Sequence, residues 1–117
     1  MQKLKISIFF LAFCFIGLTA QSAAAQIPGG YNSVSKNDPQ VKAAAKFAVA
    51  AQSKRVKHVI TLISINKAEQ QVVAGMNYKV CLQVRDGRRV RKATAVVYRN
   101  LQGKRSLTSW DWGECNW

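Results

Sequence analysis

Apolar residues recur at helical spacing between residues 38 and 55. Val41, Ala44, Ala45 and Ala48 lie on one side of a helix, and alanine favours helix intrinsically. Asp38 is a good N-cap, and the residue after it, Pro39, suits the first helical position. The sequence therefore predicts one helix from Pro39 to about residues 53–55.

The apolar pattern changes to a period of two after this helix. Tyr78, Val80, Leu82 and Val84 fall on one face of a predicted strand, with polar residues and Cys81 on the other. Similar patterns predict strands at 31–34, 56–71, 93–99 and 106–112. Turn signals at Asp86-Gly87 and at 100–104 make neighbouring strands antiparallel. We therefore expect an α+β fold in which an antiparallel sheet of four to five strands is covered by one helix.

One predicted turn is apolar, although turns between strands are normally polar. Residues 70–75 read Gln-Gln-Val-Val-Ala-Gly and lie between two predicted strands, one ending near Gln70 and one starting near Tyr78. An exposed apolar cluster is most easily explained as a contact surface. The alternative is a tight turn whose valines are buried in the core.

Residues 1–25 resemble a secretory signal peptide. Lys3 and Lys5 precede an apolar run, and small residues lead to Ala25. The alternative, a membrane anchor, needs a span of about 20 apolar residues, which is longer than this run. We therefore predict cleavage after Ala25, one domain at residues 26–117, and a secreted or periplasmic location.

Cys81 and Cys115 are the two cysteines that remain after Ala25. In an oxidising compartment they are expected to form one disulfide, although two free thiols are the alternative. Residues 26–117 also carry 16 Lys and Arg against 5 Asp and Glu, a net charge of +11. These cations are scattered and lack interleaved aromatic residues, so we expect no specific nucleic-acid partner.

The sequence does not indicate an enzyme. Its single histidine, His58, is expected on a strand and has no predicted nucleophile beside it. No cluster of ligands with metal-binding spacing is present, so we expect neither a metal nor a cofactor.

Three motifs, in order, resemble the cystatins, the family of inhibitors of papain-like cysteine proteases. They are Gly29-Gly30, the helix motif Ala45-Lys46-Phe47-Ala48-Val49, and Gln71-Val72-Val73-Ala74-Gly75, which matches the family's Q-x-V-x-G pattern. A single short motif recurs by chance, whereas three on a matching plan of elements are specific. The resemblance covers nearly all of residues 26–117.

The resemblance implies a helix wrapped by an antiparallel sheet and a protease-binding edge of three segments. Those segments would be Gly29 and Gly30; Gln71, Val72, Val73, Ala74 and Gly75; and Leu101, which stands in a second loop where many members carry Pro-Trp. It further implies a reversible, occluding inhibitor of papain-like cysteine proteases. We expect no membrane partner after signal cleavage and a monomer, with a hairpin-exchanged dimer as the alternative. The alternative is a non-inhibitory cationic module of the same fold that binds anionic membranes or polyanions.

Overall fold

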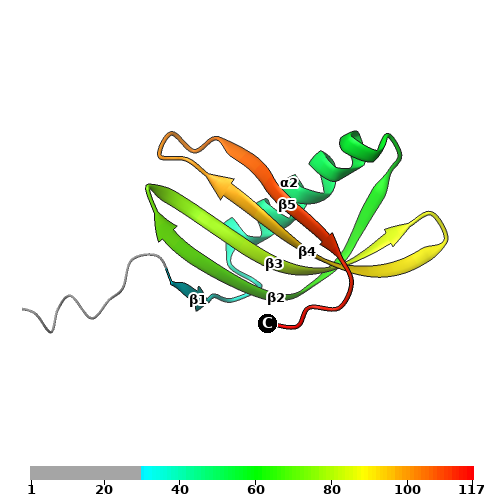
Figure 1. Cartoon of the computed structure of the whole chain (residues 1–117), viewed down its shortest axis with the longest axis horizontal. Coiled ribbons are helices and arrows are strands. Elements are labelled where there is room, and N and C mark those ends of the chain that lie inside the picture. Colours follow the sequence, from blue (N-terminus) through cyan, green and yellow to red (C-terminus); the bar gives the residue numbers. More distant parts are fainter. Residues whose placement is uncertain (1–29) are drawn as a thin grey trace, which may run out of the picture.

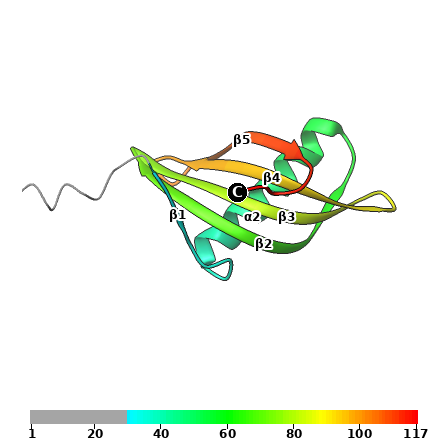
Figure 2. The same cartoon turned by 60° about the horizontal axis from the view of Figure 1, so that its bottom comes forward.

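The computed structural model describes residues 30–117; Gly29 and the predicted signal peptide lie outside the described residues. One helix lies across one face of a five-stranded antiparallel sheet, whose strands follow one another in chain order (Figures 1 and 2). The predicted α+β fold is confirmed. The elements are β1 (Tyr31–Ser33), α2 (Pro39–Val56), β2 (Ile60–Val73), β3 (Gly75–Asp86), β4 (Arg89–Arg99) and β5 (Arg105–Trp112).

Asp38 caps helix α2 as predicted. Its Oδ1 accepts hydrogen bonds from the backbone N–H of Gln40 at 2.8 Å and of Val41 at 3.4 Å. The helix continues to Val56, where Lys57 takes a left-handed conformation with φ of 63°. The predicted start of the next strand at Val56 is therefore wrong, because the left-handed cap turns the chain and β2 begins only at Ile60.

The core lies between α2 and the inner face of the sheet. The alternation predicted for the strand that holds Tyr78 to Val84 is confirmed in β3, since Tyr78, Val80, Leu82 and Val84 are all buried. Small helix residues face them and are fully buried, which lets the helix backbone approach the sheet closely. These residues are Ala44, Ala45 and Ala48.

Strand β2 does not keep a strict period of two. Its pairing with β3 shifts register between Leu62 and Ser64 and again between Ile65 and Lys67. Leu62 and Ile65 both pack against the core, whereas Ile63 is 45% exposed. These two bulges explain why both faces of the strand look partly apolar in the sequence.

The chain after β5 lies against the outer face of the sheet. Cys81 and Cys115 form a disulfide with a Cα–Cα distance of 6.0 Å. The indole N–H of Trp117 donates to the Thr94 hydroxyl at 3.0 Å, and the Lys79 ammonium lies 4.5 Å from the centre of the Trp117 ring. The disulfide therefore ties this segment across the face opposite the helix (Figure 2).

Candidate functional site

Strand pairing gathers the predicted site segments at one end of the sheet. Tyr31 lies opposite Gln71, which places Gly30 beside the tip of the β2–β3 hairpin. Met76 lies opposite Arg99, which places the same tip beside the loop after β4. Figure 1 shows the start of β1, the β2–β3 tip and the β4–β5 loop at the same end of the molecule. We call these three segments the apolar edge.

The β2–β3 tip is tighter than the sequence suggests. Strand pairing continues through Val72–Met76 and Val73–Gly75, so Ala74 alone lies between the strands. The prediction that the strands end near Gln70 and restart near Tyr78 is therefore wrong. The reason is Gly75, whose φ of +108° turns the chain sharply. A Cβ at this position would lie 2.4 Å from the carbonyl oxygen of Arg99.

The valines of the tip face solvent. Val72 is 53% exposed and Val73 is 39% exposed, and Ala74 is also exposed. The alternative that these valines belong to the core is therefore wrong. Within residues 30–117, nothing covers this apolar surface at the end of the sheet, as a contact surface requires.

Tyr98 braces the tip from the neighbouring hairpin. Its hydroxyl donates a hydrogen bond to the backbone carbonyl oxygen of Ala74. Its ring also borders Gly75, since a Cβ on that glycine would lie 3.1 Å from the Tyr98 ring. Sequence analysis missed Tyr98, because its alternation identifies a strand residue but does not show which loop its hydroxyl reaches.

Gln71 lies at the base of the tip and is half-buried. Its Oε1 accepts a hydrogen bond from the Asn77 amide Nδ2 at 2.8 Å, and these two residues are also directly paired across the strands. Its side chain therefore supports the hairpin from within. The four residues that follow, Val72 to Gly75, form the protruding part.

The second loop is held by Asn100. Its Oδ1 accepts hydrogen bonds from the backbone N–H groups of Gln102 at 3.0 Å and Lys104 at 2.8 Å. Such side-chain-to-backbone bonds fix a turn locally. Leu101 stands at the tip of this loop and is 76% exposed. Asparagine's preference for turns was the signal in the sequence that points to Asn100.

The first segment of the apolar edge enters the described residues only at Gly30. Gly30 is exposed, and among residues 30–117 a Cβ there would have no atom within 4 Å other than those of its chain neighbours. The main chain is therefore open to approach at this position.

The described residues contain no set of ligands for a metal. Residues 30–117 hold no group of three or more His, Cys, Asp or Glu side chains that could share an ion.

His58 lies in the loop between α2 and β2, so its prediction on a strand is wrong; the left-handed Lys57 ends the helix just before it. Its Nε2 lies 2.7 Å from Asp86 Oδ1, an ion-pair geometry and not a nucleophile–base pair. Within the same residues, no helix is long and apolar enough to cross a bilayer.

Comparison with known proteins identifies the family. Residues 34–112 match the SQAPI family model, described as aspartic acid proteinase inhibitor. The chain is 31% identical over 117 residues to salivary cystatin-L2 of Ixodes scapularis, covering 81% of this chain and 89% of that protein. It is 31% identical over 114 residues to cysteine proteinase inhibitor 5 of Arabidopsis thaliana, covering 95% and 93% of the two chains. The chain belongs to the cystatin family.

Two further matches, one to a sequence and one to a crystal structure, cover smaller parts of the chain. L-cystatin of Tachypleus tridentatus is 45% identical over 60 residues, which span 50% of this chain and 45% of that protein. The crystal structure of a salivary cystatin from the soft tick Ornithodoros moubata superposes with a TM-score of 0.65 at 25% identity. The match covers 75% of this chain and all of that crystallised chain, so the two share the whole of that fold.

Proposed function

We propose that this protein is a reversible, occluding inhibitor of papain-like cysteine proteases and that the apolar edge is its binding surface. The observation that carries the proposal is the convergence of Gly30, the Val72–Gly75 tip and Leu101 at one end of the sheet, with their apolar side chains uncovered. The likeness to the Arabidopsis thaliana relative supports it, because that protein is named a cysteine proteinase inhibitor.

The shape of the edge suits a cleft. Val72 and Val73 are stiff at χ1 and lose little side-chain entropy when a partner covers them. The tip is already held by Tyr98, and the second loop by Asn100, so little ordering remains to be done on binding. We expect Gly29, outside the described residues, to extend the first segment into the same cleft.

Inhibition requires that the protease does not cleave its ligand. Ala74 alone lies between two paired strands, so its peptide bonds are fixed in a tight turn. Proteases cleave extended segments, and we therefore expect the edge to fill the cleft without presenting a bond to the catalytic thiol. The protein would be secreted and would act as a monomer, and it would not be an enzyme.

A second target class is inhibition of an aspartic proteinase, which the description of the matching family model favours. The same apolar edge would have to enter a different cleft. We rank it second because the plant relative, matched over 93% of its length, is named an inhibitor of cysteine proteinases.

Titration of residues 26–117 against papain and against pepsin tests both targets. The expected result is tight, reversible inhibition of papain, with full activity recovered on dilution and no cleavage of the inhibitor. Inhibition of pepsin alone would replace the proposal by the second target. Absence of inhibition of either enzyme by a correctly folded protein would refute both.

A further inference from the structure

The end of the molecule opposite the apolar edge is strongly basic. Six exposed cations lie there, on the end of α2, the loop that follows it, and the β3–β4 hairpin: Lys54, Arg55, Lys57, Arg85, Arg88 and Arg89. We call these six residues the basic pole. Figures 1 and 2 both show the C-terminal end of α2 and the β3–β4 hairpin at the same end, away from the β2–β3 tip.

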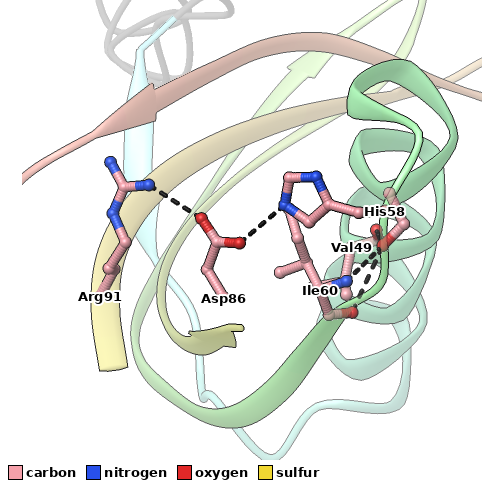
Figure 3. Close-up of polar contacts among 6 residues, drawn as sticks. Val49, His58, Ile60, Asp86 and Arg91 are labelled. Atoms are coloured by element: carbon pink, nitrogen blue, oxygen red, sulfur yellow. Dashed lines mark hydrogen bonds and ion pairs between the residues drawn. The ribbon is translucent and has the colours of Figure 1, made fainter. Parts of the chain in front are cut away.

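Polar contacts link the two segments of the basic pole, residues 54–57 and residues 85–89. Asp86 lies between His58 and Arg91, at 2.7 Å from His58 Nε2 and 2.9 Å from Arg91 Nη1 (Figure 3). The Ser53 hydroxyl accepts from the backbone N–H of Ile60 at 2.9 Å and donates to the carbonyl of Val49 at 2.8 Å, which ties the helix end to β2. Asp86 is thus engaged by two other residues, and the cations of the pole are presented on a fixed surface.

Exposed valines stand among these cations. Val59 is 77% exposed, and Val90, between Arg89 and Arg91, is 49% exposed. Val90 is paired with Arg85, which is paired in turn with Thr61, so these three share the outer face of the sheet. Val59 lies in the loop directly before β2, two residues before Thr61 and two residues after Lys57.

We propose that the basic pole binds the surface of an anionic phospholipid bilayer. Cations are attracted by anionic headgroups, and apolar side chains among them gain from burial at the interface between headgroups and acyl chains. A soluble polyanion would satisfy the cations but would leave Val59 and Val90 in water. The combination of charge and exposed valines therefore favours a membrane surface.

A protein that binds a bilayer through the basic pole can still be an inhibitor, unlike the non-inhibitory cationic module considered above. The reason is that the basic pole lies at the end of the molecule that the apolar edge does not occupy. A molecule bound through the basic pole would hold the Val72–Gly75 tip away from the bilayer and free for a protease. Membrane binding and protease inhibition would be separate properties, and the loss of one would leave the other intact.

The test measures co-sedimentation of residues 26–117 with vesicles of phosphatidylcholine, with and without phosphatidylserine, at about 0.1 M salt. A charge variant replaces three residues of the pole, Lys57→Gln, Arg88→Gln and Arg89→Gln. A matched control removes the same charge from exposed lysines before and within α2, namely Lys36→Gln, Lys42→Gln and Lys46→Gln. A third variant, Val59→Thr with Val90→Thr, keeps the branched shape and removes apolar surface.

Binding to vesicles that contain phosphatidylserine is expected, with little to phosphatidylcholine alone. Each cation near an anionic surface contributes about a fivefold change in affinity, so the pole variant should bind roughly a hundredfold more weakly. The control triple should lose much less, and the valine variant about tenfold. Melting temperature and papain inhibition should be unchanged in all three variants.

Three results would overturn the proposal. The first is absence of binding to phosphatidylserine vesicles. The second is equal loss in the pole variant and the control triple, which would indicate diffuse attraction by net charge. The third is unchanged vesicle binding in the valine variant; retention on a heparin column that is lost in the pole variant would then identify a soluble polyanion as the occupant.

Discussion

The hydroxyl of Tyr98 is hydrogen-bonded to the backbone carbonyl oxygen of Ala74, and the two residues belong to different hairpins. Ala74 is the one residue between β2 and β3, and Tyr98 lies near the end of β4. The contact joins the first loop of the apolar edge to the hairpin that carries the second. The relative position of the two loops is therefore set within the free protein.

Tyr98→Phe should weaken protease inhibition more than it weakens folding. The substitution keeps the ring beside Gly75 and removes one neutral hydrogen bond, which is worth about 1 kcal/mol. If the bond holds the tip in its binding position, the inhibition constant for papain should rise about three- to tenfold. The measurement pairs that constant with the melting temperature. A fall in melting temperature with an unchanged inhibition constant would show that the bond serves stability alone.

Gly75→Ala should lower stability far more than Gly87→Ala, the same change in the β3–β4 hairpin at the basic pole. Alanine at residue 75 would be held at φ +108° with its Cβ 2.4 Å from a backbone oxygen, so something must shift. We expect a loss of more than about 2 kcal/mol in the free energy of unfolding, or a displaced tip with lost inhibition. Gly87→Ala is the matched control, because its φ is 63° and no atom lies within 4 Å of the added Cβ. It should cost about 1 kcal/mol. Equal effects in the two variants would contradict the structure.

Val73→Asp should weaken inhibition strongly and leave the fold intact. A carboxylate without a partner in a dry interface is expensive to desolvate, so the inhibition constant should rise roughly a hundredfold or more. Val59→Asp is the matched control, since it introduces the same change into an exposed valine at the opposite end. The control should inhibit papain normally. An unfolded Val73→Asp protein, or equal inhibition by both variants, would rule out the apolar edge as the binding surface.

The disulfide should contribute measurably to stability. Cys81 and Cys115 are separated by 34 residues, and closing a loop of that size is worth about 3–4 kcal/mol when unstrained. A double variant, Cys81→Ala with Cys115→Ala, should show a lower denaturant midpoint and should loosen the segment after β5. An unchanged midpoint would mean that the contacts of Trp117 hold this segment by themselves.

Stability should depend on pH through Asp86. Hydrogen bonds from His58, and then from Arg91, lower the pKa of the Asp86 carboxyl. Because the pKa is lower in the folded state, the carboxylate contributes stability above its unfolded pKa of about 3.9, and this contribution is lost as pH falls through the folded value. Asp86→Asn should therefore be less stable than wild type near neutral pH. This gap, the difference in the free energy of unfolding between the two proteins, should close below about pH 3.9.

Denaturant unfolding of both proteins across this pH range measures the gap. Asp111→Asn, on an exposed position of β5, serves as the control for removing one carboxylate. A gap between wild type and Asp86→Asn that widens on acidification would contradict the assignment.

Much of the fold could be predicted from local chemistry. Asp38 and Pro39 define the start of α2, and the alternation from Tyr78 to Val84 defines the buried face of β3. Errors occurred where one residue's backbone conformation decides the outcome. Lys57 turns the chain in a left-handed cap, and Gly75 closes a hairpin around a single residue. Neither φ value can be inferred from the hydrophobic pattern.

The candidate site divides in the same way. Two segments of the edge were predicted from motifs that resemble those of a family, and the third, at Leu101, from its place in a turn where the family has its second loop. Strand pairing brings the described parts of these segments together. Tyr98 was missed because its role depends on which loop its hydroxyl reaches. That information lies in the register between hairpins, such as Met76 opposite Arg99, and a period of two does not contain it.

The two bulges of β2 have a consequence beyond their effect on the sequence pattern. Strand β2 has 14 residues, yet its ladder with β1 covers only three of them, Glu69 to Gln71. A long, regular strand with an open side is a template on which another chain can add and start aggregation. The register shifts at Leu62–Ser64 and Ile65–Lys67 interrupt that template, and the charged Lys67 stands beside the second interruption. The same irregularities thus act as protection against the assembly of one copy of the protein on another, strand to strand.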